Sequence, residues 1–256
     1  MKAHILSVFA MLFIAGAGAL AADGEPVVQI DHIIWAVPDL DAGAQHLAEL
    51  SGVEPITGGI HPGRGTRNKL IGAGDNMYLE VIAPDPAQMP LDPDANPVQA
   101  FADRISKMDG PEVDMYAYAS SDLEYMAEAG RKLGLQVVGP TPGQRRTPGG
   151  ELIRWSHVDF VGHGFGQFIP FAINWLDSPH PSTTSPGGAV IEGITVQHPR
   201  ADELRRIYEG LRIPAKVIQG DEPVIIVHMR SDKGAFELRS GNSLFDYYAA
   251  RSGDNI

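Results

Sequence analysis

Cysteine is absent from this chain of 256 residues, which excludes disulfides, thiolate chemistry and a lipid-modified cysteine. An oxidising compartment therefore imposes no cost on the protein. Basic residues are also few, because 20 Lys and Arg stand against 32 Asp and Glu and give a formal net charge of −12. Without a basic surface to neutralise phosphates, we expect no nucleic-acid partner.

Two hydrolase motifs and long internal apolar runs are missing as well. Neither the G-x-S-x-G elbow of serine hydrolases nor the H-E-x-x-H helix of zinc peptidases occurs. Beyond the amino terminus, no stretch stays apolar for long enough to cross a membrane. We therefore expect no membrane association once the amino-terminal segment is removed.

The amino terminus has the pattern of an export signal. Met1-Lys2 precedes an apolar run at 5–14, and small residues lead to Ala21 and Ala22. A charged start, a short apolar core and an A-x-A ending are typical of secretory signals. We expect a signal peptide at 1–21, cleaved after Ala21 or Ala22, and a periplasmic or secreted protein. The alternative, a membrane anchor, needs about 20 apolar residues.

Strand-like and helix-like segments follow one another in the same order three times. The first copy has a strand at 27–37, a helix from Asp39 to Gly52 and three short strands. The same order begins again near 112 and near 189. The predicted organisation is module 1 at 27–84, a linker at 85–111, module 2 at 112–177, a linker at 178–188, module 3 at 189–240 and a tail at 241–256.

Modules 1 and 3 can be superposed at both ends. Residues 31–38 (D-H-I-I-W-A-V-P) lie over 192–199 (E-G-I-T-V-Q-H-P), and 78–81 (Y-L-E-V) lie over 235–238 (A-F-E-L). Agreement in the first and the last strand favours true repetition.

A repeated strand–helix–three-strand unit, with His in the first strand and Glu in the last, resembles the vicinal oxygen chelate superfamily. Residues 31–41, 61–68, 78–83 and 170–175 with His180-Pro181 are similar to its glyoxalase-like domain family. This resemblance implies an α+β fold in which repeated βαβββ modules form cupped mixed β-sheets with helices packed outside. Two modules would form the cup. The third either packs on the cup or serves dimerisation, which leaves a homodimer open.

In that superfamily, metal ligands come from the first and last strands of the modules. The resemblance implies His32, Glu80 and Glu237 as ligands of a divalent transition metal, Fe, Mn, Ni or Zn. Gly193, Met115 and Phe171 stand near the other positions, so the full four-ligand set is incomplete. A loop histidine is the alternative third ligand. Without a metal, His32 and Glu80 would hydrogen-bond each other.

A polar loop punctuated by glycine begins at His61. We interpret His61 as a third metal ligand or an acid–base group, Arg64 as an anchor for a substrate carboxylate and Asn68 as an orienting amide. Glu80 is the candidate base, because burial raises a carboxyl pKa toward a useful range. The alternative for this segment is an ordinary loop with exposed charges.

Aromatic residues of module 2 are candidates for substrate binding. Trp155 and His157 lie on one predicted strand, where His157 either lines the cup or is a structural histidine. Trp175, next to the linker with His180-Pro181, either closes over the cup or packs there.

Together these residues predict an exported glyoxalase-like protein with metal-dependent lyase, isomerase or dioxygenase-type chemistry on a small oxygenated substrate. The alternative is a metal-free protein that binds or sequesters a small molecule, which the incomplete ligand set favours. A structural partner-binding module, the third class, predicts an exposed apolar patch and no ligand-sized cavity.

Overall fold

The computed structural model of the chain describes residues 26–96 and 99–241. The predicted signal peptide at 1–21 lies outside the described residues, as does nearly all of the predicted tail, and both stay predictions. Within the part of the chain that is described, no helix is long and apolar enough to cross a membrane.

Module 1 forms one half of an eight-stranded sheet. Its elements are β1 (Val28–Ala36), α1 (Leu40–Ser51), β2 (Ile56–His61), β3 (Thr66–Gly72) and β4 (Tyr78–Pro84). The carboxylate of Asp39 caps the first turn of α1, and Gly52 ends the helix in the left-handed conformation that glycine adopts readily. β1 pairs in parallel with β4, which gives the strand order β2-β3-β4-β1.

Module 2 forms the other half with a mirrored strand order, β5-β8-β7-β6. Its elements are β5 (Glu112–Ser120), α3 (Leu123–Lys132), β6 (Gln136–Arg146), β7 (Leu152–Val161) and β8 (Phe171–Asn174). β1 and β5 pair antiparallel, with Ile33 opposite Tyr116, and this pairing joins the two modules into one continuous sheet. Modules 1 and 2 are therefore the pair that makes the cup.

The two outer strands of this sheet also meet. Arg145 of β6 donates a hydrogen bond of 2.7 Å from Nη1 to the carbonyl oxygen of Gly58 in β2. Gly58 is free to accept it because a bulge between Thr57 and Gly59 interrupts the β2–β3 ladder. The sheet is thus curled until its edges touch, and its concave face becomes the inside of a cup.

Short helical segments lie in the connections. They are η1 (Pro86–Gln88) and α2 (Ala100–Ile105) between the first two modules, η3 (Gly166–Phe168) before β8, and η4 (Pro181–Thr183) before module 3. α2 was not expected in the predicted linker at 85–111. It packs with Ile105 against Ala36 and Ile82 on the concave side of the sheet.

Module 3 forms a separate four-stranded sheet in the order β10-β9-β11-β12. Its elements are β9 (Ala189–His198), α4 (Ala201–Gly210), β10 (Lys216–Gln219), β11 (Val224–Ser231) and β12 (Gly234–Arg239). The order of elements in module 3 repeats that of module 1, but the strand order differs, because β12 pairs with β11 at the edge and not with β9. Similar local sequences specify strands and helices, whereas strand partners depend on long-range packing.

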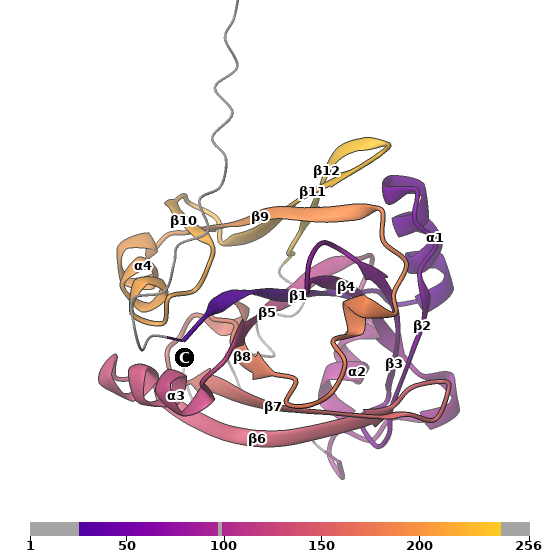
Figure 1. The fold of residues 1–256 in the computed structure, drawn as a ribbon, viewed down its shortest axis with the longest axis horizontal. Helices are drawn as coiled ribbons and strands as arrows, with labels where there is room; N and C mark the ends of the chain where they lie inside the picture. Colours follow the sequence, from indigo (N-terminus) through magenta and orange to yellow (C-terminus); the bar gives the residue numbers. More distant parts are fainter. Residues whose placement is uncertain (1–25, 97–98, 242–256) are drawn as a thin grey trace, which may run out of the picture.

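The second sheet covers the convex face of the first, on the side of β1 and β5 that faces away from β6 and β7 (Figure 1). Side chains alternate along β1, so Ile33 and Trp35 join Ile194 and Leu204 of module 3 in the main core. His32 and Ile34 point to the opposite, concave side. The expected α+β fold with cupped mixed sheets is confirmed, and module 3 packs on the cup.

Candidate active site

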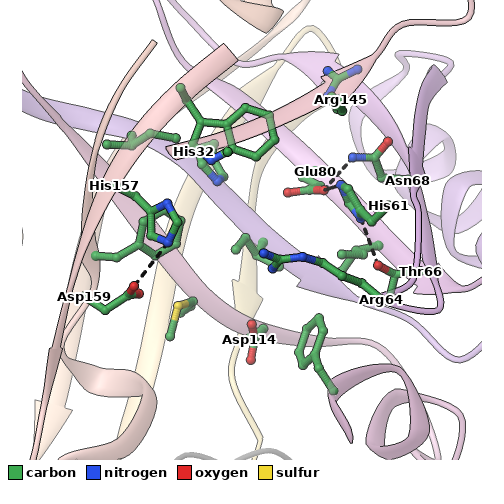
Figure 2. A pocket seen from close by; sticks show the side chains of 18 of the residues that line it. His32, His61, Arg64, Thr66, Asn68, Glu80, Asp114, Arg145, His157 and Asp159 are labelled. Carbon is green, nitrogen blue, oxygen red and sulfur yellow. Dashed lines mark hydrogen bonds and ion pairs between the residues drawn. The ribbon is translucent and has the colours of Figure 1, made fainter. Parts of the chain in front are cut away.

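A cavity of about 670 Å³ occupies the concave face of the eight-stranded sheet. A volume of that size suits a small molecule, since ligand pockets usually enclose a few hundred cubic ångströms. Figure 2 shows side chains of both modules pointing into it. Every residue of the predicted site except Glu237 lines this cavity: His32, His61, Arg64, Asn68, Glu80, Trp155, His157 and Trp175.

Strand register brings His32 and Glu80 into the same cavity. In the parallel β1–β4 ladder, His32 lies opposite Tyr78 and Ile34 lies opposite Glu80. Because alternate residues of a strand share a face, the imidazole and the carboxylate project to the same side from neighbouring strands. They bond to different partners, so the alternative in which they hydrogen-bond each other is wrong.

Glu80 is held at one oxygen. Its Oε1 accepts a hydrogen bond of 2.5 Å from Nδ2 of Asn68 and lies 3.9 Å from Nε2 of His61. Nδ1 of His61 lies 2.8 Å from the hydroxyl oxygen of Thr66. Oε2 of Glu80 has no partner among the described residues, so one oxygen of a fixed, nearly buried carboxylate remains for a ligand.

The environment of His61 favours its neutral form. Burial lowers the pKa of His61 below its usual value, the carboxylate of Glu80 acts in the opposite direction, and Arg145 and Arg64 lower the pKa further. His61 therefore carries no charge near pH 7 and can either donate or accept a hydrogen bond beside Glu80.

A fully buried carboxylate, Asp31, orients His32. A β-bulge between Ile30 and His32 leaves Asp31 out of the β1–β5 ladder, and its Oδ1 lies 2.5 Å from Nδ1 of His32. Its Oδ2 lies 2.9 Å from Nε1 of Trp175 and 3.2 Å from Nε2 of His180. Burial acts to raise the pKa of Asp31, but hydrogen bonds from His180 and His32 outweigh burial and lower it.

This network sets the proton positions on both histidines. An ionised carboxylate only accepts hydrogen bonds, so Nδ1 of His32 and Nε2 of His180 are the donors. Nδ1 of His180 accepts a hydrogen bond from the backbone N–H of Ser182, which agrees with this tautomer. In neutral His32, Nε2 is left as the acceptor, and it has no hydrogen-bond partner among residues 26–96 and 99–241.

Aromatic rings form one wall of the cavity. The ring of His32 stacks on Tyr78 with centroids 4.6 Å apart, and Trp155 lies 5.6 Å from Trp175. Since Asp31 holds both Trp175 and His180, the structure favours the interpretation in which this segment packs beside the cavity over the one in which it closes as a lid.

The metal-ligand set implied by the resemblance does not assemble. Glu237 lies on β12 in the second sheet, where its carboxylate is 3.2 Å from Nδ1 of His228 and 3.0 Å from Nη2 of Arg239. β12 lies at the edge of that sheet, next to β11 and not next to β9, the first strand of module 3. Within the described ranges, no three His, Cys, Asp or Glu side chains converge closely enough to hold one ion.

The residues present therefore fit a transition metal poorly. Nε2 of His32 and Oε2 of Glu80 are two suitable donors on one face, and His61, the loop histidine expected as an alternative third ligand, lies 3.9 Å from Oε1 of Glu80. Among the described residues, these three side chains do not form a group that could hold one ion. A stable site needs at least a third protein ligand.

Three contributors to the site were not predicted from the sequence. Asp31 stands directly before His32, and this Asp-His pair is the sequence feature that could have identified Asp31 as part of the site. Arg145 belongs to a doublet with Arg146, but nothing local indicated that β6 would reach β2. Asp114 of β5 also lines the cavity, at its lower end in Figure 2. No sequence motif indicated that this residue belongs to the site.

Two βαβββ modules joined edge to edge around a concave cavity define a vicinal oxygen chelate fold. The sequence model of the glyoxalase-like domain matches residues 30–212, and the chain belongs to the glyoxalase-like domain family. A search of curated proteins finds no match to this chain.

Solved structures match this chain at low sequence identity, and of the three described below the first has a TM-score above 0.5 and shares the fold. A hypothetical protein from Staphylococcus aureus matches with a TM-score of 0.58 and 19% identity over 84% of this chain and 87% of its own. A mutant 4-hydroxymandelate synthase from Streptomyces coelicolor matches with a TM-score of 0.47 and 19% identity, over 84% of this chain and 63% of its own. Methylmalonyl-CoA epimerase from Mycobacterium tuberculosis matches with a TM-score of 0.37 and 23% identity, over 56% of this chain and 84% of its own. At these identities the likeness concerns the fold alone.

Proposed function

We propose that this chain is an exported enzyme that moves a proton on a small oxygenated substrate, with Glu80 as the base. The observation that carries the proposal is the fixed carboxylate of Glu80, with one oxygen held by Asn68 and the other free, beside the neutral imidazole of His61. Both groups lie in a cavity of the right size for such a substrate.

The proton would pass from a carbon next to a substrate carbonyl to Oε2 of Glu80. The electron pair left on that carbon moves to the carbonyl oxygen, which becomes negatively charged. In the tautomer in which Thr66 donates to Nδ1, Nε2–H of His61 donates a hydrogen bond to that oxygen. Asn68 keeps the carboxylate in one orientation throughout. A positioned base of this kind contributes roughly 10²–10⁴-fold to the rate.

The predicted divalent metal enters no step of this proposal. Nε2 of His32 and Oε2 of Glu80 would be its donors, and an ion there would polarise a substrate oxygen. The proposal gives the metal no step because the ligand set is incomplete: Glu237 lies outside the cavity, and no group of three ligands forms among the described residues.

Hydrogen exchange tests the proposed chemistry without knowledge of the natural substrate. We expect the protein to speed the exchange of α-protons in pyruvate, hydroxyacetone or dihydroxyacetone with D2O, measured by ¹H NMR. Glu80→Gln should abolish this acceleration. If the protein accelerates exchange in none of the three compounds, the proposal is contradicted.

A second function, sequestration of a small molecule, is favoured by the aromatic wall. Trp155 and Trp175, which are only partly buried, offer flat surfaces on which a planar ligand can stack without reaction. If the protein binds a planar compound tightly and accelerates α-proton exchange in none of the test compounds, sequestration is favoured over catalysis.

A further inference from the structure

Arg145 reaches the predicted site from the opposite module. It lies on β6, whereas His61, Asn68 and Glu80 belong to module 1. Its side chain is 7% exposed and lines the cavity, and Nη1 is anchored to the carbonyl oxygen of Gly58. A Cβ atom at position 59 would lie 3.3 Å from this nitrogen, so glycine at that position leaves the room that the guanidinium occupies.

The cavity therefore contains two arginines, Arg145 and Arg64, on either side of the Glu80–His61 pair (Figure 2). Both positive charges act on His61, since both lower its pKa. Among the described residues, neither guanidinium has a carboxylate within ion-pair distance. A nearly buried cation without a paired anion is costly, and a bound anion would offset that cost.

The negative charge of the rest of the protein limits where an anion can bind. The chain carries a net charge of −12, and the cavity lining also includes Glu80, Asp114 and Asp159, so an anion can be held only where it lies closer to the two guanidinium groups than to these carboxylates. Guanidinium groups match carboxylates in shape and donate paired hydrogen bonds to them.

We propose that Arg145 is a specificity-determining residue of this cavity and that, with Arg64, it selects a small carboxylate as the ligand. This inference rests on the proposed function in one respect, because it takes the cavity as the place where the substrate binds. The anchored hydrogen bond to Gly58 fixes one end of the guanidinium, and its remaining N–H groups face the ligand.

Titration with matched charged and neutral probes tests the inference. Malonate and pyruvate are compared with malonamide and pyruvamide, and binding is followed by the fluorescence of Trp155 and Trp175, which line the cavity. We expect the wild-type chain to bind at least one acid and to bind its amide much more weakly. Equal binding of acid and amide, or no binding of either acid, overturns the inference.

The neighbouring arginine supplies the control. Arg146 is exposed and donates to the carbonyl oxygen of Gly150, away from the cavity. Arg145→Met should weaken binding of the acid roughly 10- to 100-fold, the range expected for a charge-assisted hydrogen bond, whereas Arg146→Met should leave it unchanged. Unchanged binding in Arg145→Met overturns the inference.

Arg145→Met also removes the hydrogen bond to Gly58, so a second variant separates the loss of charge from the loss of that bond. Arg64 is exposed in its loop and has no hydrogen bond to lose within the described residues, and Arg64→Met should also weaken acid binding. Folding of each variant is checked by circular dichroism. If Arg64→Met is folded and binds the acid normally, the two-arginine recognition is wrong.

Binding and chemistry can fail separately. Binding of an acid that depends on Arg145, with no exchange of α-protons, would keep the inference and remove the proposed reaction. Exchange in hydroxyacetone that does not depend on Arg145, with no preference for acids, would keep the reaction and remove the inference.

Discussion

The buried carboxylate of Asp31 accepts a hydrogen bond of 2.9 Å from the indole nitrogen of Trp175, although 144 residues separate them. The same oxygen lies 3.2 Å from Nε2 of His180, and the other oxygen lies 2.5 Å from His32. One side chain thus ties the first strand of the cup to the end of β8 and to the linker before module 3. Asp31 both stabilises the fold and orients the imidazole of His32.

Asp31→Asn should lower the free energy of unfolding by about 2–4 kcal/mol, because the new amide nitrogen faces groups that are themselves donors. Urea unfolding followed by circular dichroism measures the loss. Asp41→Asn is the matched control: Asp41 is an exposed carboxylate paired with Lys69, and its loss should destabilise the protein much less. Equal losses in the two variants would contradict the role given to Asp31.

His61 should shape the acid side of the pH profile. Because burial lowers its pKa below 6.5, His61 is neutral in the folded protein at pH 7 and gains its proton only at lower pH. The rate of α-proton exchange should therefore be constant around pH 7 and decrease as the pH falls below 6.5. The unfolded chain takes up this proton first, so stability should also decline as the pH falls below 6.5.

An NMR titration of the His61 ring gives its pKa directly, and His61→Gln identifies the signal and should remove the part of the fall in rate that follows the titration of His61. A pKa at or above 6.5 would contradict the account of His61.

The sequence predicted the modules and eight of the residues that line the cavity, because strands, helices and the face on which a strand residue lies are local properties. Alternation along a strand and a capped helix can be read from neighbouring residues, as at Asp39 and Gly52. The strand order of module 3 and the contact between Arg145 and Gly58 join distant segments. Glu237 shows the consequence, since a matching Glu in a matching strand came to lie in another sheet.

Metal content is the next test. Because no three donors among the described residues, His32, Glu80 and His61 included, form a group that could hold an ion, we expect purified protein to hold well under one transition-metal ion per chain, as measured by mass spectrometry of the elements. Chelation should leave acid binding intact. A stoichiometric ion that is lost in His32→Ala and in Glu80→Ala would contradict this expectation and support metal-dependent chemistry.

Export makes a separate prediction. If residues 1–21 or 1–22 are a signal, protein from a periplasmic or culture fraction should begin at Ala22 or Asp23, as shown by intact mass. Replacing Ala21 by a bulky residue should slow processing, because signal peptidase sites need small residues. A full-length chain confined to the cytoplasmic fraction would count against export.

Two glutamates that the sequence pattern equates, Glu80 and Glu237, allow the most direct test of the proposed chemistry. The measurement is α-proton exchange into D2O by the wild-type chain, Glu80→Gln and Glu237→Gln. The account predicts a loss of roughly 10²-fold or more in Glu80→Gln and wild-type exchange in Glu237→Gln, whose carboxylate lies in the other sheet. Full activity in Glu80→Gln would contradict it.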